Sequence, residues 1–590
     1  MAIDNFKFWC QKVLPLVYDD SLSYYEVLCK VSSKLNEVIN SENNLVENLP
    51  NEIKNVILEM INNGDLQNII IDELLKSNIR CYDNVAEMLS DKNLTQNNVL
   101  YCKGYYEPLD GGDSLYITSN IISKKPHLSA NNLNFYWVVT ETVSVKQFGA
   151  KGDKLTDDTQ AFQNALDTGF NILVPLMYGQ QYLINNTLTV SHDRCIVYGD
   201  LPTHYFMDYR TDDEFSDYSH GSIICNFNNT ADPLFLCTGQ FQTFANLAIV
   251  RNNLTLVPAD SVGNIAIKYE KTTENGTDIS NVDGEVRNCL FRHFNHAVEL
   301  YGRGLWYTDC YNIHNNIDFY IKFKTSNWWK DEESSTSMLQ TYPEFYGRGI
   351  RFQNNRIHTS LEWTIKVDTE PVEGVADWNG NVLNGAIIAN NQIDLGRGGF
   401  LFNAPLYGCT ISDNVFFRLS TNGITFTNKV KNTLVSNNVI RGLISTVRPS
   451  MDFLPLYGIY CSGDVEGLNI SNNTFDKVNL CCIILDNNNT TNLNISNNTF
   501  TDYSYRHESD DAVYNYTGVV LNGTVTLSTI VNNNFKPKEY RGNFGVRAKS
   551  PTTSVWTNVV ILGNTAYSSD LTPYALPTGA GTERNTVQDY

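Results

Sequence analysis

Apolar residues recur at a helical period in the first 80 residues. Positions three or four apart are apolar in three stretches, and asparagine-rich breaks at 40–44 and 62–64 separate them. This spacing predicts three amphipathic helices. Two interpretations fit: a self-contained helical bundle, or a module that trimerises or docks onto a larger assembly. The apolar stripes contain Leu28, Val31, Leu35 and Val38, then Ile53, Val56, Ile57 and Met60, then Leu66, Ile69, Ile70 and Leu74.

The pattern changes between about residues 83 and 142. Residues 115–118 and 135–139 alternate like strands, and turn signals occur at Gly104 and at 110–112. No Gly-Lys-Ser/Thr follows the Gly-Gly pair, so the pair indicates a turn and not a phosphate loop. We expect a small β-rich connector here.

From about residue 143 one phrase is repeated with variation at intervals of a little over twenty residues, or that plus an insertion. β-Branched residues flank each copy, and no helical period lies between copies. This pattern predicts a right-handed parallel β-helix in which each repeat is one coil. The copies are FQNNRI at 352–357, IANNQI at 388–393, ISDNVF at 411–416, VSNNVI at 435–440, ISNNTF at 470–475 and 495–500, and IVNNNF at 530–535.

The paired asparagines in this phrase have a structural interpretation. Asparagine tolerates the left-handed backbone of a tight turn, and stacked amides can bond to one another along the solenoid axis. We therefore expect turn and ladder residues here, in preference to catalytic ones.

The segment that opens the repeat region begins VSVKQFGAKGDKLTDDTQAFQNAL at residue 143. Gly149 and Gly152 supply a turn, and Asp157 or Asp158 can accept hydrogen bonds from the free amides of the helix that follows. The apolar face of that helix, with Ala161, Phe162 and Leu166, would plug the first coil. Calcium binding or catalysis by Asp153, Asp157 and Asp158 is the weaker alternative, since the run lacks the oxygen spacing of an EF-hand loop.

This opening, with ILVP at 172–175 and QYLINNTLTV at 181–190, resembles the pectate-lyase-like β-helix superfamily found in bacteriophage tail spikes. The N-terminal VLPLVYDDSLSYYEVLCKVSSKLNEVIN resembles the start of tail or preneck appendages of small podoviruses that infect low-GC Gram-positive bacteria. The phrase GYYEPLDGGDSLYIT is similar to linkers before spike β-helices. The resemblance implies a homotrimeric virion protein that contacts phage tail or collar proteins through its N-terminal helices and a bacterial surface glycan through its solenoid.

These patterns divide the chain into four parts. We expect a helical virion-attachment domain at 1–82, a β-rich connector at 83–142, the β-helix with a glycan groove at 143–545, and an irregular segment at 546–590.

Composition narrows the function. The formal net charge of −21 argues against a nucleic-acid partner. The N-terminus lacks the features of a signal peptide, and no run of about 18 apolar residues occurs, so we expect a chain that is made in a cytoplasm and has no membrane span. The resemblance implies that the cytoplasm is that of the host and that the chain is a virion protein that acts at the host cell surface. The thirteen cysteines lack metal-site spacing, and we interpret them as reduced, mostly buried thiols.

Outward-facing acids on a β-helix form ladders with about 4.8 Å between coils. Alternation predicts that Glu299, Asp318 and Glu362 point outward; Asp318 comes 19 residues after Glu299, and Glu362 another 44 after that. We therefore expect one catalytic ladder of these three acids. Adjacent coils would give the close carboxyl pair of a retaining glycosidase, about 5 Å, and alternate coils the wide spacing of an inverting one. A structural alternative is that outward acids are only solvated surface.

Aromatic and arginine residues lie near these acids in sequence. Aromatic rings stack on sugars, and arginines grip uronates or phosphates. Asp368 and Asp394 are further acids. The expected substrate-binding residues are Trp328, Trp329, Tyr346, Arg348, Trp378 and Arg397.

Three functions remain open. The first is a depolymerase of capsule, wall polysaccharide or teichoic acid, as a glycoside hydrolase in preference to a metal-assisted lyase. The second is a non-catalytic adhesin on the same scaffold, and the third is a structural virion protein. We expect no cofactor, with Ca²⁺ as the one alternative. The fold is shared by hydrolases, lyases and non-enzymes, so it cannot choose among them.

Overall fold

The computed structural model describes residues 79–120, 127–138, 141–176, 181–200, 223–226, 232–251, 264–270, 282–302, 304–323, 349–369, 382–443, 454–503, 517–536, 544–550, 552–566, 572–575, 577 and 586–588. The chain divides into two compact units, 1–149 and 150–590. The predicted N-terminal helices lie outside the described residues.

The first unit contains the predicted β-rich connector. Its sheet has the order β1-β2-β3-β5-β4. The turn at 110–112 is closed by Asp110, whose carboxylate accepts hydrogen bonds from the amides of Tyr105, Tyr106 and Gly112. The elements are β1 (Arg80–Tyr82), α5 (Val85–Ser90), β2 (Val99–Cys102), β3 (Ser114–Ser119), β4 (Leu128–Ala130), β5 (Leu133–Trp137), β6 (Thr142–Ser144) and the 3-10 helix η1 (Val145–Phe148).

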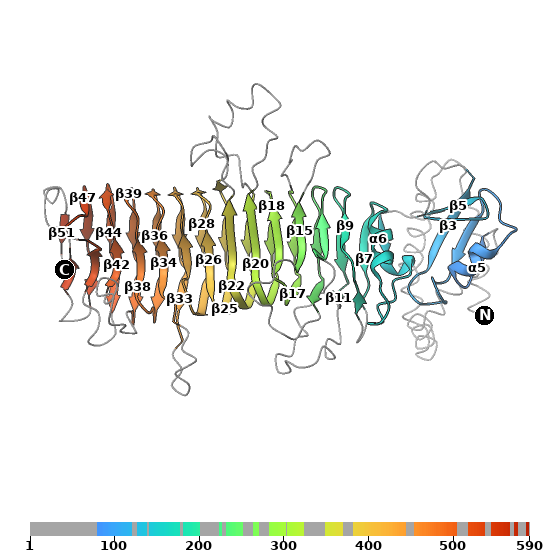
Figure 1. Cartoon of the computed structure of the whole chain (residues 1–590), viewed down its shortest axis with the longest axis horizontal. Helices are drawn as coiled ribbons and strands as arrows, with labels where there is room; N and C mark the ends of the chain where they lie inside the picture. Colours follow the sequence, from blue (N-terminus) through green and yellow to red (C-terminus); the bar gives the residue numbers. More distant parts are fainter. Residues whose placement is uncertain are drawn as a thin grey trace, which may run out of the picture. The chain divides into compact units, whose positions relative to one another are not determined.

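The second unit is a parallel β-helix, as the repeat predicted, and its coils follow one another along the axis (Figure 1). Each coil contributes strands to three faces, here called A, B and C, and from residue 383 a short fourth strand forms face D.

Face A contains β7 (Asn171–Val174), β10 (Ile196–Gly199), β13 (Thr243–Ala245), β16 (Glu285–Arg287), β19 (Trp306–Thr308), β21 (Arg351–Gln353), β24 (Ile387–Ala389), β28 (Thr410–Ser412), β32 (Leu434–Ser436), β36 (Asn469–Ser471), β40 (Asn494–Ser496), β44 (Thr529–Val531), β48 (Val560–Leu562) and β51 (Thr586–Gln588). Face B contains β8 (Tyr182–Leu183), β11 (Ile223–Asn226), β14 (Ala248–Arg251), β17 (Leu290–Arg292), β25 (Gln392–Gly396), β29 (Val415–Leu419), β33 (Val439–Arg441), β37 (Thr474–Asp476), β41 (Thr499–Thr501), β45 (Asn534–Lys536) and β49 (Thr565–Ala566).

Face C contains β9 (Leu188–Val190), β12 (Phe235–Cys237), β15 (Ile265–Glu270), β18 (His296–Tyr301), β26 (Gly398–Phe402), β30 (Ile424–Phe426), β34 (Tyr457–Cys461), β38 (Cys481–Leu485), β42 (Thr517–Leu521), β46 (Phe544–Ala548) and β50 (Thr572–Ala575). Two long strands, β20 (Tyr311–Phe323) and β22 (Arg356–Thr369), run through faces B and C without a break. Face D contains β23 (Leu383–Asn384), β27 (Leu406–Tyr407), β31 (Val430–Lys431), β35 (Val465–Glu466), β39 (Asn489–Thr491), β43 (Thr524–Thr526) and β47 (Val555–Thr557).

The prediction of an irregular segment at 546–590 is wrong. Strands β47 to β51 continue the solenoid, and β48 pairs in parallel with both β44 and β51. The physical reason is that LGN at 562–564 repeats the turn phrase with glycine in place of the first asparagine. Gly563 takes the left-handed backbone, with φ of 67°. Asn564 joins the asparagine ladder.

The sequence predicted two roles for the paired asparagines, a left-handed turn and a hydrogen-bonded ladder. Each residue of a pair has one of these roles. The first residue of each pair has a left-handed backbone, as in Asn437 with φ of 57°. The second is buried and joins a ladder: Asn438 Nδ2 donates to Asn473 Oδ1 at 2.9 Å, and Asn473 Nδ2 donates to Asn498 Oδ1 at 3.0 Å. The ladder consists of Asn355, Asn391, Asn414, Asn438, Asn473, Asn498, Asn533 and Asn564.

Helix α6 (Thr159–Leu166) covers the first coil, as expected, and buries Ala161, Phe162 and Leu166. Asp157 accepts from the amide of Thr159 at 3.0 Å, so it caps the helix. Asp158 instead binds the preceding loop: its carboxylate accepts from the amides of Lys151 at 2.6 Å and Gly152 at 2.9 Å.

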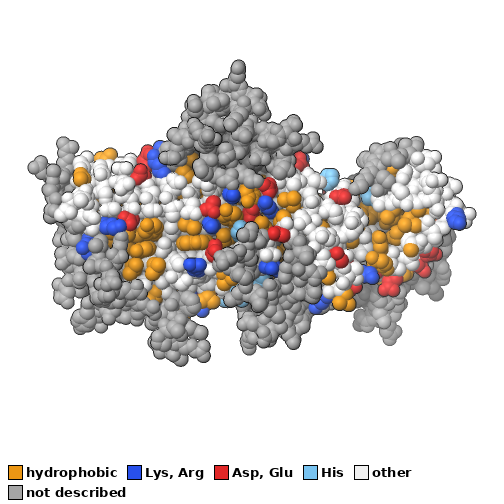
Figure 2. Space-filling model, viewed as in Figure 1, with side chains coloured by type: hydrophobic (Ala, Val, Ile, Leu, Met, Phe, Trp, Pro, Cys, Tyr) orange, Lys and Arg blue, Asp and Glu red, His pale blue; other side chains and the backbone are white. Residues whose placement is uncertain are grey.

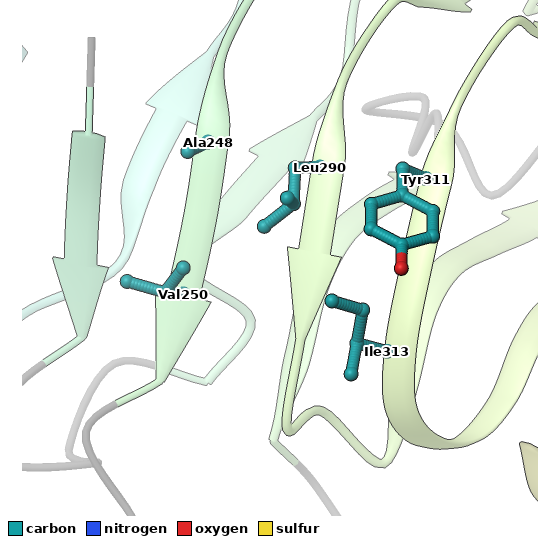
Figure 3. Close-up of a cluster of buried hydrophobic side chains, with 5 residues drawn as sticks. All are labelled: Ala248, Val250, Leu290, Tyr311 and Ile313. Carbon is teal, nitrogen blue, oxygen red and sulfur yellow. The ribbon is translucent and has the colours of Figure 1, made fainter. Parts of the chain in front are cut away.

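Aromatic and aliphatic side chains fill the solenoid interior. Phe500 stacks between Phe475 and Phe535, with ring centroids 5.2 and 4.7 Å away. The opposite side of the face-B strands is also apolar over β14, β17 and β20, where a second buried cluster lies (Figure 3). The cluster consists of Ala248, Val250, Leu290, Tyr311 and Ile313.

The cysteines whose side chains the structure describes are free thiols, and all of these but Cys81 are buried. Within the described segments, no helix has the length and apolarity needed to cross a bilayer.

Candidate functional site

The predicted ladder of three acids has the wrong register. Glu299 pairs with Tyr320, which pairs with Lys366, so neither Asp318 nor Glu362 stacks on Glu299. Paired residues of β18 and β20 are 21 apart in sequence and not 19, as in Glu299 and Tyr320, and those of β20 and β22 on face C are 46 apart and not 44, as in Tyr320 and Lys366. The second interval includes an irregularity: from the Asn315–Ser360 pair to the Ile317–Trp363 pair, β20 advances two residues and β22 three. An interval count along the sequence cannot establish this register.

Asp318 is fully buried and therefore does not face solvent. It accepts a hydrogen bond from Asn315 Nδ2 at 3.0 Å and another from the Ser360 hydroxyl. Burial raises its pKa to about 7, against the lowering effect of these two hydrogen bonds. The residue supports the bend between faces B and C and has no access to a surface ligand.

The other predicted site residues are dispersed. Glu362 is half-buried within the bulge of β22. Arg397 is exposed at the turn between β25 and β26. The remaining substrate-binding predictions lie outside the described residues: Trp328, Trp329, Tyr346, Arg348 and Trp378.

Glu299 belongs to a different cluster, which we call the Tyr–Lys patch. It occupies the outward side of face C from β15 to the residue that follows β26, and the strand register places its residues in two neighbouring rows. The first row is Lys268, Glu299, Tyr320 and Lys366, and the second is Glu270, Tyr301, Lys322, Asp368 and Asn403; His296 lies beside the first row.

The Glu299 carboxylate lies at one end of the patch. Its Oε2 is 2.5 Å from His296 Nδ1, and its Oε1 is 4.0 Å from Lys268 Nζ. Lys268 also pairs with Glu270 at 2.6 Å. Two carboxylates of adjacent coils therefore share one ammonium group.

Asp368 is the third acidic residue of the patch, after Glu270 and Glu299. It accepts from the Tyr320 hydroxyl at 3.0 Å and from Asn403 Nδ2 at 2.6 Å, and Lys366 Nζ is 3.6 Å away. Burial, and next the Asp368 charge, raise the pKa of Tyr320. Tyr320 therefore stays a neutral hydrogen-bond donor at physiological pH.

Tyr301 lies between two lysines. Lys268 Nζ is 4.7 Å and Lys322 Nζ 5.9 Å from its ring centroid. Ammonium groups at these distances interact with the ring face. The patch thus combines aromatic surface with charges of both signs.

The charged groups of the patch are more buried than is usual for surface charges. Glu299 is 4% exposed and Lys366 28%. Partly desolvated charges in one cluster are a typical feature of functional sites. Figure 2 shows acidic and basic side chains gathered near the middle of the solenoid on the face in view.

The patch ends where face C becomes apolar. At β34, β38 and β42 the outward side carries the buried Cys481, Ile484 and Val520, against which Tyr457 and Tyr460 pack. Among the described residues, no group of three or more histidine, cysteine or acidic side chains is arranged to hold a metal ion.

The sequence analysis missed most of the patch because it applied strand alternation to acidic residues alone. The same alternation applied to IAIKYE at 265–270 and HAVELY at 296–301 would have indicated Lys268, Glu270 and Tyr301. Histidine and glutamate three residues apart, as in His296 and Glu299, were a further signal.

Comparison with known proteins gives partial matches. The PRANC domain matches residues 2–71. The preneck appendage proteins of Bacillus phages PZA and phi29 are each 26% identical to this chain over 165 residues, which is 28% of this chain and 14% of either relative. The chain therefore matches only a small part of the length of these relatives.

Among solved structures, the enzymatically active domain of tailspike protein 2 from bacteriophage CBA120 aligns with 84% of this chain and 60% of its own, at 11% identity and a TM-score of 0.42. In sequence, this chain is thus similar to phage preneck appendage proteins over 28% of its length, and in fold it is a parallel β-helix.

Proposed function

We propose that this protein is a bacteriophage tail appendage that binds a bacterial surface glycan on the Tyr–Lys patch. The observation that carries this proposal is the cluster of half-buried charges around Tyr301 and Tyr320 on adjacent coils. Tyrosine rings pack against sugar faces, while lysines and carboxylates bind hydroxyl or acidic groups. Attachment to a virion is supported by the similarity to preneck appendage proteins. The same proposal includes a homotrimer held to tail or collar proteins by the N-terminal segment.

Cleavage of the bound glycan is the second candidate. Glu299 and Asp368 lie on β18 and β22, with Tyr320 of β20 between them. Strands two coils apart are separated by about 9–10 Å, and the two residues also lie in different rows, so this pair fits the wide spacing of inverting glycosidases better than the close spacing of retaining ones. This pair replaces the three-acid ladder, whose register is wrong. A pair of carboxylates favours hydrolysis of the glycan over elimination. Binding of the glycan without cleavage is the alternative.

The binding proposal can be tested with isolated surface glycans from a panel of Gram-positive bacteria. Biolayer interferometry should detect saturable binding of the full chain to at least one glycan. Tyr301→Ala and Lys322→Ala should each weaken it about tenfold, which corresponds to about 1.4 kcal/mol.

The matched control is Glu466→Gln, on face D, where Glu466 pairs with Lys431 at 3.1 Å. It should bind as tightly as the wild type. Equal affinity in all four proteins would exclude the patch as the binding surface. New reducing ends in the same incubations would distinguish cleavage from adhesion alone.

A further inference from the structure

His296 and Glu299 form a carboxylate–histidine pair on one strand. The Nδ1 atom of His296 is 2.5 Å from Glu299 Oε2. The carboxylate is 4% exposed and the imidazole 15%. The ring is therefore the partner nearer to solvent, while the carboxylate lies deeper.

This geometry fixes the position of the imidazole proton. An ionised carboxylate only accepts hydrogen bonds, so Nδ1 must carry the proton that the two atoms share. A neutral imidazole then keeps its lone pair on Nε2. In the part of the chain that the structure describes, no hydrogen bond occupies Nε2 of His296.

Neighbouring strands restrain both members of the pair. Lys268 of β15 lies 4.0 Å from the second oxygen of Glu299 and binds Glu270. Tyr320 of β20 packs against the imidazole, with ring centroids 4.6 Å apart. The Tyr320 hydroxyl donates a hydrogen bond to Asp368, and Lys366 Nζ lies 5.7 Å from the centroid of the Tyr320 ring. Among the described residues, these are the charged and titratable groups that face His296 from the adjoining strands.

We propose that His296 is the proton acceptor of the Tyr–Lys patch and that Glu299 is its positioning residue. This rests on the proposed cleavage of a glycan, and it gives Glu299 a role through His296 in place of direct membership of a carboxyl pair. Nε2 takes a proton from a water molecule as the water oxygen bonds to the anomeric carbon. The bond from that carbon to the leaving oxygen breaks, and this oxygen takes a proton from solvent. Glu299 stabilises the imidazolium, which then returns its proton to solvent.

The tautomer gives a test that needs no substrate. Full-length protein with ¹⁵N-labelled histidine is measured by long-range ¹H–¹⁵N correlation, and the signals missing from His296→Asn assign the residue. The neutral ring should show protonated Nδ1 and bare Nε2. Protonated Nε2 with bare Nδ1 would overturn the proposal, because no lone pair would then face the substrate.

Cleavage variants test the role itself. His296→Asn places an amide nitrogen near the Nδ1 position, so it can still donate to Glu299, but it lacks a base at Nε2. Its cleavage rate at saturating glycan should fall by about 10²–10⁴-fold, the usual contribution of a general base. The ascending limb of the pH–rate profile should disappear. His296→Ala should regain activity when imidazole is added, which a purely structural role would not allow.

Glu299→Gln should lower the cleavage rate at saturating glycan, and Glu466→Gln serves again as the control. Wild-type cleavage rates in His296→Asn would overturn this assignment while the proposed cleavage stands. A wild-type protein that binds glycan but releases no product would overturn both and leave adhesion. Absence of binding to any glycan of the panel would overturn the proposed function itself.

Discussion

The asparagine ladder predicts that two neighbouring residues of the same type differ sharply in their contribution to stability. The side chain of Asn438 makes four hydrogen bonds. Its Nδ2 donates to Ile411 O and to Asn473 Oδ1, both at 2.9 Å, and its Oδ1 accepts from the amide and from Nδ2 of Asn414 at 3.0 and 2.9 Å. Asn437 is exposed and supplies only a left-handed turn.

Asn438→Ala removes all four bonds and leaves buried groups without partners. With a net value of about 1 kcal/mol for each bond, the free energy of unfolding should fall by about 4 kcal/mol. Asn438→Asp should be at least as damaging, because a carboxylate cannot donate to Ile411 O or Asn473 Oδ1. Asn437→Gly keeps the left-handed turn and should change stability by less than about 0.5 kcal/mol.

Thermal unfolding followed by circular dichroism at one fixed heating rate compares these variants, since a long solenoid need not unfold reversibly. The apparent midpoint should fall clearly for Asn438→Ala and stay at the wild-type value for Asn437→Gly. Equal midpoints for both variants would refute the view that the ladder bonds, and not the turn, hold successive coils together.

Three further outcomes follow from individual contacts. The pKa of Asp318 is raised from 3.8 to about 7 in the folded protein. Below pH 3.8 the carboxyl is neutral in both the folded and the unfolded state, so its burial costs no stability. As pH rises through about 7 the carboxyl must ionise in the folded state too, and that stability is lost. Asp318→Asn should therefore melt later than the wild type above about pH 7 but not near pH 4, with a difference of up to about 4 kcal/mol; a difference that does not vary with pH would contradict this. Phe500→Ala opens a cavity between Phe475 and Phe535 and should cost about 3–5 kcal/mol in denaturant unfolding, against a much smaller loss for Phe500→Leu. Asp158→Ala removes two hydrogen bonds of the loop before α6, one buried and one part-buried, and should cost about 2–4 kcal/mol, with increased proteolysis near residue 152 as a second readout; protease resistance equal to the wild type would count against this role.

The repeated phrase predicted the solenoid because its two asparagines meet separate physical demands. One demand is a left-handed turn and the other is a buried amide that bonds along the axis, and both recur once per coil at Asn472 and Asn473 as at Asn497 and Asn498. The sequence analysis missed the last coil because glycine, at Gly563, adopts the left-handed turn as readily as asparagine does.

The candidate site could not be predicted to the same degree because it depends on register across coils. One extra residue between Ser360 and Trp363 moves every later side chain of β22 relative to β20. Alternation along β18 correctly placed Glu299 outward, but it could not show that Asp318 of the next coil is buried at a bend. Local patterns therefore predict which side chains point outward within a straight strand, whereas bends and the neighbours of a side chain follow only from the strand pairing.

The position of glycan binding is the central claim, and hydrogen–deuterium exchange of the full chain tests it most directly. In the presence of a bound host glycan, amides of β15, β18, β20 and β22 on face C should exchange more slowly, while those of face D at β31 and β35 should be unchanged. Protection confined to face D or to the connector sheet, with face C unaffected, would contradict the account.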